Sequence, residues 1–275
     1  MSTITIGPLA LPVAPLLVGA ALFAAQWLAG RISADPVLAR RAQWDLNLAT
    51  LVALLASRAA FVLIHLDAFA ASPWSVLDLR DGGWHPAGGV VGAGLWVLWR
   101  VRRDPPRRRV LGLAALAGVA MWTVAHVGLG LLAGSSQERR APELTLNAFP
   151  AGEPKTLPAL VQGQPTVVNL WATWCGPCRA EMPTLAQAQR RETGVRFLFV
   201  NQGEGPDPIR AYLQREGLAL QDVWLDPTSA LGPAVGSAGL PTTLFYDAQG
   251  RLVDTHVGVL SDAVLRVRLS ELQRR

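Results

Sequence analysis

Cysteine is scarce in this 275-residue sequence: there are only two, and both lie in the tetrapeptide Cys175-Gly176-Pro177-Cys178. This scarcity excludes a structural disulfide anywhere else in the chain. A bridge across so short a loop removes little entropy from the unfolded chain, and its geometry is tight. The pair therefore indicates redox reactivity rather than a structural crosslink.

Histidine is equally scarce in the second half of the chain, where His256 is the only one after residue 140. A CxxC pair can also be half of a zinc site, which needs further ligands. No second CxxC exists, so cysteine and histidine alone cannot complete a tetrahedral site within the chain. We expect no metal, and no cofactor other than a redox-active Cys175–Cys178 disulfide.

Lysine is absent from the first 140 residues, which instead contain 13 arginines against 7 acidic residues. The rest of the chain has 12 basic and 13 acidic residues, so the basic excess belongs to the first part. These arginines stand beside long apolar runs rather than on a polar face with interleaved aromatics, which argues against a nucleic-acid partner. The change in composition near residue 140 predicts two domains, the first of them in a membrane.

Residues 1–134 are expected to form an all-α transmembrane domain of about four spans in the lipid bilayer. A run of about 20 apolar residues is long enough to cross the hydrocarbon core. The second run contains Arg58 and His65, which we expect to face protein, water or an interface rather than lipid. The third is short and glycine-rich. The four runs cover about 6–29, 46–71, 88–101 and 110–132.

The distribution of arginine predicts the orientation of these spans. Residues 100–109 contain six arginines and one acidic residue, and the connection around Arg31, Arg40 and Arg41 is also basic, so both should be cytoplasmic. With four spans, the carboxy-terminal domain then faces the periplasm or extracytoplasmic side of the inner membrane. A three-span chain with a cytoplasmic domain is the alternative. The amino terminus lacks the positive region of a secretory signal, so we expect no cleaved signal peptide.

The polar, proline-bearing residues 135–165 should form the linker and the entry to a soluble domain covering residues 166–275. Apolar runs and helical periodicity predict alternating strands and helices, followed by a hairpin and a final helix capped by Ser261. The strands are expected at 166–171, 195–200, 242–246 and 252–257, and the helices at 179–190, 207–216 and 261–272.

The cysteine pair lies where the first of these strands leads into a helix. Free amides and the dipole at a helix amino terminus stabilise a thiolate, which makes Cys175 the nucleophile. Cys178, within the first helical turn, would then resolve the mixed disulfide formed with a partner protein. Pro177 suits the first turn and should stiffen the pair.

The sequence from Val168 to Pro183, with Gly239-Leu-Pro-Thr-Thr-Leu-Phe245 downstream, resembles the TlpA-like, membrane-anchored thiol-disulfide oxidoreductases of the thioredoxin superfamily. The resemblance covers roughly residues 141–275. It implies an α/β thioredoxin fold, with a central mixed sheet flanked by helices. It also implies that Pro241 is a cis-proline facing the cysteines, with a trans turn proline as the alternative. The stretch between Asn201 and Trp224 would be the insertion that distinguishes this group from plain thioredoxin.

The resemblance further implies roles for individual side chains. Glu181 matches an acid near the active site that tunes the cysteines or accepts a proton, a solvated helix residue being the alternative. The position of thioredoxin's buried acid corresponds to Asn169, which cannot titrate. Trp171 is either core or part of the site, and Trp174 is expected to shield the cysteines. The expected substrate-binding residues are Trp174, Gly176, Pro177, Leu240 and Pro241.

The amino-terminal region weakly resembles a truncated prolipoprotein diacylglyceryl transferase, through residues 57–63 and 81–92. Ala87 stands where that family has histidine, with His85 displaced by two positions. We therefore interpret this region as an anchor that contacts lipid or a partner, whose glycines permit close helix packing. Arg58 is either a remnant of that site or a residue facing a cavity or interface.

These observations predict a protein-disulfide reductase on the extracytoplasmic side, because the Gly176-Pro177 dipeptide resembles that of reducing members of the family. In an oxidising compartment, the thiol pair of such an enzyme needs an electron source to remain reduced. A membrane thiol-relay protein would supply electrons, and oxidised protein cysteines would receive them, apocytochrome c being one substrate that the resemblance implies. Two other hypotheses remain: a lipid-modifying transferase with an accessory redox domain, and a non-catalytic binding module with a thioredoxin fold.

Overall fold

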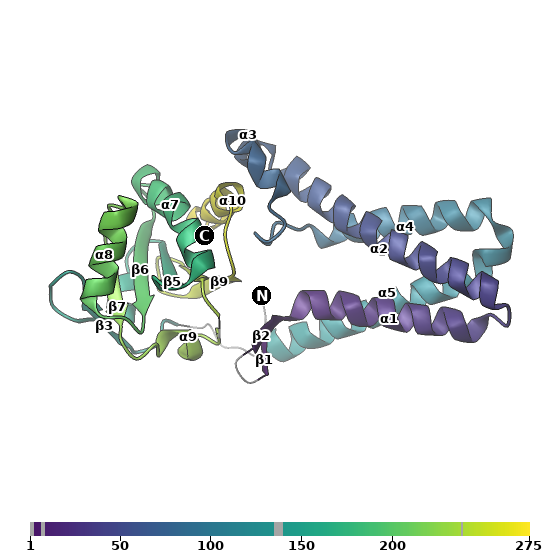
Figure 1. Ribbon diagram of the computed structural model, residues 1–275, viewed down its shortest axis with the longest axis horizontal. Helices are drawn as coiled ribbons and strands as arrows, with labels where there is room; N and C mark the ends of the chain where they lie inside the picture. Colours follow the sequence, from purple (N-terminus) through teal and green to yellow (C-terminus); the bar gives the residue numbers. More distant parts are fainter. Residues whose placement is uncertain (1–2, 7–8, 135–139, 238) are drawn as a thin grey trace. The chain divides into compact units, whose positions relative to one another are not determined.

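The computed structural model describes residues 3–6, 9–134, 140–237 and 239–275. The chain divides into two compact units. One, the helical unit, contains Pro12–Leu66 and Gly83–Ser136; the other contains Met1–Leu11, Asp67–Gly82 and Gln137–Arg275. Both are drawn in Figure 1, coloured along the sequence.

Four long helices make up the helical unit: α1 (Val13–Ile32), α2 (Pro36–Ile64), α4 (Pro86–Arg103) and α5 (Arg108–Gly134). Helix α2 packs against α4, and α1 against α5 (Figure 1). Segments Pro36–Ile64 and Pro105–Gly128 are long and apolar enough to cross a membrane, and Leu16–Ile32 is a shorter apolar helix. The four helices correspond to the four apolar runs of the sequence.

Two helix boundaries differ from the prediction. The first helix was expected from residue 6, but β1 (Thr3–Ile6) and β2 (Leu9–Pro12) pair as strands and α1 begins only after Pro12, since proline interrupts a helix interior. The second was expected at 46–71, but it begins at Pro36. Asp35 caps α2 by accepting a hydrogen bond from Val37 N at 2.8 Å.

As a result, the predicted basic connection is partly helical. Arg40 and Arg41 lie in the first turns of α2, and Arg31 lies in the last turn of α1. Helix α2 ends at Ile64, and the residues after His65 form the separate helix α3 (Leu66–Ala71). Two 3-10 turns complete this half of the chain, η1 (Pro73–Leu77) and η2 (Pro105–Arg107).

The glycines of α4 allow it to approach α2 closely. A Cβ added to Gly92 would lie 2.5 Å from the Cβ of Ala56, and one added to Gly88 would lie 2.5 Å from that of Ala60. This confirms the prediction that the glycines serve helix packing. His85 Nδ1 accepts a hydrogen bond from Gly88 N at 3.1 Å and so caps α4.

Arg58 is buried on α2, and its Nη1 donates to the carbonyl oxygen of Gly83 at 2.8 Å. The expectation that this charged side chain faces protein rather than lipid is therefore confirmed.

The carboxy-terminal part contains a seven-stranded sheet in the order β4-β3-β7-β6-β5-β8-β9. The central strand β5 runs parallel to β6 and antiparallel to β8, so the sheet is mixed, as expected. The strands are β3 (Thr145–Ala148), β4 (Lys155–Thr156), β5 (Thr166–Trp171), β6 (Arg196–Gln202), β7 (Val223–Asp226), β8 (Thr242–Tyr246) and β9 (Leu252–Val257).

Five helices accompany this sheet, and α7 and α10 pack against each other. Ser261 caps α10 by accepting a hydrogen bond from Val264 N at 3.3 Å, which confirms the predicted cap. The helices are α6 (Leu157–Val161), α7 (Gly176–Arg191), α8 (Pro206–Glu216), α9 (Leu231–Ala234) and α10 (Asp262–Gln273).

The segment assigned to the linker and domain entry contributes β3, β4 and α6 to the folded domain. Strand β3 pairs with β7, and Leu146, Leu157 and Val161 are fully buried in the same core as Val168 of β5. The folded domain thus starts well before residue 166.

Candidate active site

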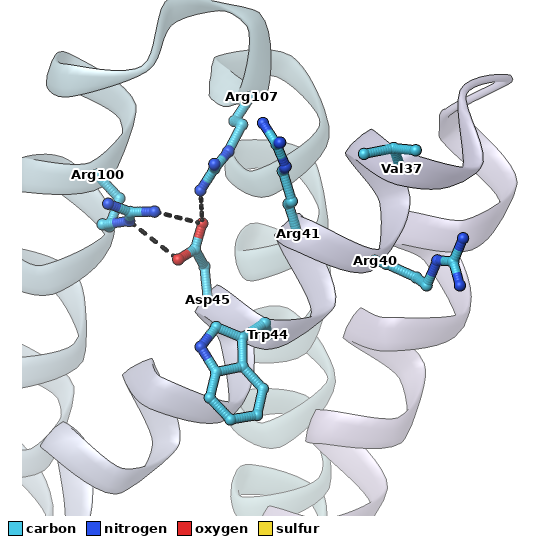
Figure 2. Close-up of a pocket in the computed structure, with 7 residues that line it drawn as sticks. All are labelled: Val37, Arg40, Arg41, Trp44, Asp45, Arg100 and Arg107. Atoms are coloured by element: carbon cyan, nitrogen blue, oxygen red, sulfur yellow. Dashed lines mark hydrogen bonds and ion pairs between the residues drawn. The ribbon is translucent and has the colours of Figure 1, made fainter.

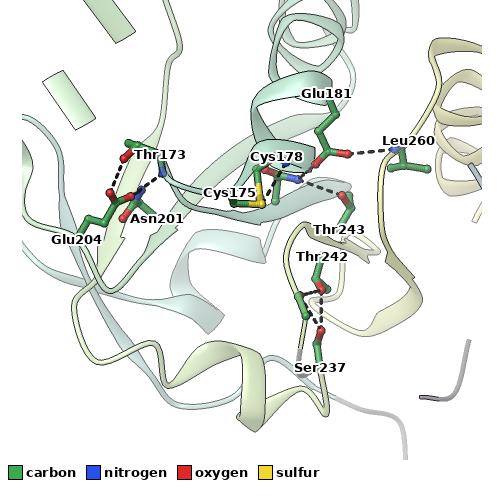
Figure 3. The surroundings of a disulfide bond; sticks show 12 residues. Thr173, Cys175, Cys178, Glu181, Asn201, Glu204, Ser237, Thr242, Thr243 and Leu260 are labelled. Atoms are coloured by element: carbon green, nitrogen blue, oxygen red, sulfur yellow. Dashed lines mark hydrogen bonds between the residues drawn. A yellow bond between two sulfur atoms is a disulfide. The ribbon is translucent and has the colours of Figure 1, made fainter. Parts of the chain in front are cut away.

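The cysteine pair lies at the junction of β5 and α7, as the sequence predicts. Cys175 is the amino-terminal cap of α7, and its Sγ accepts a hydrogen bond from Cys178 N at 3.2 Å. The two sulfurs form a disulfide in this structure (Figure 3). Pro177 lies in the first turn, where its missing N–H would have no intrahelical partner.

The two sulfurs differ in their access to solvent. Cys175 retains 5% of its surface, whereas Cys178 is fully buried. An incoming partner would therefore meet Cys175, while Cys178 can react only with a sulfur already held at the site. Trp174, next to Cys175, is 70% exposed, so most of its indole is in contact with solvent. The expectation that it shields the cysteines stays a prediction. Trp171 is fully buried and packs against Tyr212, as a core residue does.

Glu181 lies on α7 one turn beyond Cys178, and only 1% of its surface is exposed. Its Oε1 accepts from Asn169 Nδ2 at 2.8 Å, and its Oε2 accepts from Leu260 N at 3.0 Å (Figure 3). Burial penalises the charged form and raises the pKa of Glu181 to about 7, although both hydrogen bonds act in the opposite direction. The alternative of a solvated helix residue is therefore wrong.

Asn169 connects this carboxyl group to the sheet. Besides donating to Glu181, its Nδ2 lies 3.1 Å from Thr243 Oγ1 on β8. The sequence identified Asn169 only as a non-titrating substitute for an acid. In the structure, the amide fixes the position of the acid that is present.

The segment before β8 contains the expected proline. The Leu240–Pro241 peptide bond is cis, so the alternative of a trans turn proline is wrong. Thr242 Oγ1 lies 2.6 Å from Gly239 O and 2.6 Å from Ser237 Oγ, which ties the start of β8 to the preceding loop (Figure 3).

One residue of the site was missed by the sequence reasoning. Glu204 follows β6, and its carboxylate accepts from Thr173 N at 2.7 Å, from Thr173 Oγ1 and from Asn201 Nδ2 at 2.7 Å (Figure 3). These bonds hold the loop that carries Cys175. The available signal was topological: β5 and β6 are parallel neighbours, so residues after their carboxyl ends meet at one edge of the sheet.

Comparison with known proteins agrees with this geometry. Residues 136–268 match the family model described as Redoxin. The thiol:disulfide interchange protein HelX of Rhodobacter capsulatus is 31% identical over 49% of this chain and 75% of its own length. The DsbE homolog of Paracoccus denitrificans, also a thiol:disulfide interchange protein, is 30% identical over 54% of this chain and 80% of its own length.

Among solved structures, a putative thiol:disulfide interchange protein DsbE from Chlorobium tepidum aligns with a TM-score of 0.45 and 23% identity. The alignment covers 50% of this chain and 98% of that one. The family model does not extend to the α1–α5 region, so the resemblance of that region to a prolipoprotein diacylglyceryl transferase stays a prediction.

The cysteine pair, the mixed sheet and the region that matches the Redoxin family model all lie in the carboxy-terminal half of the molecule. The chain belongs to the redoxin-type thiol-disulfide oxidoreductases that include the DsbE-like thiol:disulfide interchange proteins.

Proposed function

We propose that this protein is a membrane-anchored protein-disulfide reductase whose catalytic domain works outside the cytoplasm. The observation that carries the proposal is the position of Cys175, at the amino terminus of α7 with an amide 3.2 Å from its sulfur. A helix amino terminus stabilises a thiolate and lowers the pKa of the thiol, so Cys175 can attack a disulfide at neutral pH.

The reaction consists of two exchanges. The Cys175 thiolate attacks one sulfur of a substrate disulfide, forms a mixed disulfide and releases the other substrate sulfur as a thiolate. Cys178, deprotonated, then attacks Cys175 Sγ, closes the Cys175–Cys178 disulfide and releases the second substrate thiol. Two electrons pass from the enzyme's dithiol to the substrate, and the disulfide in the structure is the oxidised end state.

Glu181 is the group suited to take the proton from Cys178. It lies one helical turn further along α7, on the same side of the helix, and both groups are buried. A carboxyl with a pKa of about 7 is poised to exchange a proton near neutral pH. Its position would couple resolution to proton transfer within the protein interior.

The substrate would bind around Cys175, the cysteine of the pair that retains some solvent access. We assign this role to Trp174, Gly176 and Pro177 at the start of α7 and to Leu240 and Pro241 before β8. The largely exposed indole offers apolar area to a partner chain, while the Leu240 backbone can pair with an extended segment.

The helical unit supplies the anchor in this proposal. Its long apolar helices favour insertion in the inner membrane, and the arginines between α4 and α5 favour a cytoplasmic location for that connection. A membrane thiol-relay protein would return electrons to the oxidised pair. The reduced pair would then act on oxidised protein substrates, of which apocytochrome c is a candidate.

Insulin reduction by the purified full-length chain in neutral detergent tests the proposed activity. The dithiol form should reduce insulin, the Cys175→Ser variant should lose activity, and the Cys178→Ser variant should accumulate a mixed disulfide. A reduction potential near thioredoxin's value of about −270 mV would support a reductant, and one near about −120 mV would indicate an oxidant. Equal activity in wild type and Cys175→Ser would refute the mechanism.

A further inference from the structure

Arginine is concentrated at one end of the helical unit. These residues lie in the last turns of α1 and α4, the first turns of α2 and α5, and the 3-10 turn η2 between α4 and α5. Arg58, near the other end of α2, is the exception. The group at the basic end is Arg31, Arg40, Arg41, Arg100, Arg102, Arg103, Arg107, Arg108 and Arg109.

An open pocket of about 390 Å³ lies at this basic end (Figure 2). Its base is Asp45 of α2, which is 1% exposed. Arg100 Nε donates to Asp45 Oδ1 at 2.9 Å, and Arg107 Nη1 donates to Asp45 Oδ2 at 2.8 Å. The buried carboxylate thus fixes two guanidinium groups from two different elements. They form a preorganised cationic surface.

Asp45 does not neutralise the charge of this pocket. Arg40 and Arg41 also line it, and no acidic side chain in the described part of the chain forms an ion pair with either of them. Asp104 pairs with Arg107 from outside the lining. Even with Asp104 included, the four guanidinium groups that line the pocket outnumber the two carboxylates, so its net charge is positive.

Exposed tryptophan side chains lie at the same end of the helical unit as the pocket. Trp44 lines it and is 65% exposed, and Trp27 and Trp99 are exposed at the same end. Arg31 lies over the ring of Trp27, and Arg103 over that of Trp99. Exposed tryptophan beside arginine is typical of the level of lipid headgroups. Further along α2, the exposed leucines 51, 54 and 55 provide an apolar surface for acyl chains.

We propose that the Asp45–Arg100–Arg107 pocket binds the phosphate group of an anionic membrane phospholipid, with Arg41 as an additional cationic contact. Basic pockets between helices at the cytoplasmic side suit such headgroups. Figure 2 shows the Arg41 guanidinium on the side of Arg107, across from Arg100. The inference rests on the proposed insertion of the helical unit in a membrane.

The test uses the full-length chain in neutral detergent, titrated with phosphatidylglycerol, phosphatidylcholine or inorganic phosphate, with the thermal unfolding midpoint as readout. Phosphatidylglycerol should bind saturably and more tightly than phosphatidylcholine. Arg41→Gln should weaken its binding about fivefold, as expected for the loss of one cation near a lipid surface. Arg102→Gln is the matched control, because Arg102 is exposed at the same end but does not line the pocket. It should bind like wild type.

Three results would overturn the proposal. Equal binding of the two lipids would exclude a headgroup site, and equal losses in the two variants would show diffuse attraction without a pocket. Inorganic phosphate binding as tightly as phosphatidylglycerol would indicate a soluble anion. Two further assays separate failure of the lipid site from failure of the proposed function: alkaline extraction of membranes tests membrane insertion, and the insulin assay tests disulfide reduction. A chain that is active and stays in the membrane but binds no phosphatidylglycerol would disprove the lipid site alone.

Discussion

Glu181 is a buried side chain whose protonation state affects stability and, in the proposed mechanism, proton transfer. Desolvation raises its pKa to about 7, so near neutral pH the carboxyl exists in both protonation states. Two hydrogen bonds from Asn169 and Leu260 hold it in place in the interior. Burial of the ionised carboxylate destabilises the folded protein. A residue with a purely structural role could avoid this cost by being uncharged.

The Glu181→Gln substitution should change the pH dependence of stability. The folded-state pKa is raised, so between about pH 4.5 and 7 the folded protein binds more protons than the unfolded chain, and its free energy of unfolding falls as pH rises. The contribution is at most about 3–4 kcal/mol, since a pKa difference of one unit corresponds to about 1.4 kcal/mol. Urea unfolding of the oxidised protein at pH 5 and 8 should show this loss in wild type but not in Glu181→Gln.

Identical pH slopes in the two proteins would contradict a raised pKa at Glu181. The same substitution should also slow the release of substrate from the mixed disulfide above neutral pH, because glutamine cannot accept the Cys178 proton. A stability change without that kinetic change would leave Glu181 a structural residue.

Sequence reasoning singled out Cys175 and Cys178 from the spacing of the CxxC motif, and Glu181 and Pro241 through the resemblance to TlpA-like oxidoreductases. Sequence reasoning missed Glu204, because Glu204 and its partner Thr173 lie 31 positions apart in the chain, in the segments that follow β6 and β5. A predicted parallel pair of strands indicates that their carboxyl ends meet at one edge of the sheet, but which side chains contact each other there depends on strand register, which a single sequence does not contain.

At the scale of elements, the sequence located helix ends well where a capping residue marks them. Ser261 caps α10, which begins at Asp262, one residue after the predicted start. Helix α7 begins at Gly176, three residues before the predicted range, although Cys178 lies in its first turn as expected. The start of α2 was placed ten residues too late because hydropathy detects only its apolar part, while Arg40 and Arg41 occupy the first turns. The sequence Asp35-Pro36 carried the missing signal, a capping side chain followed by proline at the first helical position.

The packing of α4 on α2 predicts a position-specific effect of glycine substitution. Gly92→Leu should destabilise the helical unit by about 1–3 kcal/mol, because its Cβ would lie 2.5 Å from the Cβ of Ala56 and the helices would have to separate. Gly94→Leu on the same helix is the matched control, since a Cβ there meets nothing within 4 Å. Thermal unfolding of the full-length chain in detergent should show a lower midpoint for Gly92→Leu alone. Equal midpoints would refute close packing at this contact.

At the scale of the whole molecule, the change in composition near residue 140 predicted the division into a helical and an α/β part. The strands with continuous apolar runs, β5, β6 and β8, were also predictable. Strands β3 and β4 were not, because they have four and two residues and polar neighbours, so only their pairing with β7 and with each other defines them.

The orientation of the chain can be read from its own cysteines, since both lie in the active site. If the catalytic domain faces outward, a membrane-impermeant maleimide should label reduced protein in intact spheroplasts. A Cys175→Ser variant, whose remaining thiol is fully buried, should label poorly. Labelling that requires prior lysis would place the domain in the cytoplasm and support the three-span alternative.

The rate of alkylation of Cys175 as a function of pH, measured on the reduced full-length protein, tests the central claim most directly. We predict that the rate follows a thiol pKa well below the value of about 8.5 for a free cysteine, and that Cys178 stays unreactive under native conditions. A Cys175 that titrates like an ordinary thiol, or two sulfurs that both resist the reagent, would contradict the account.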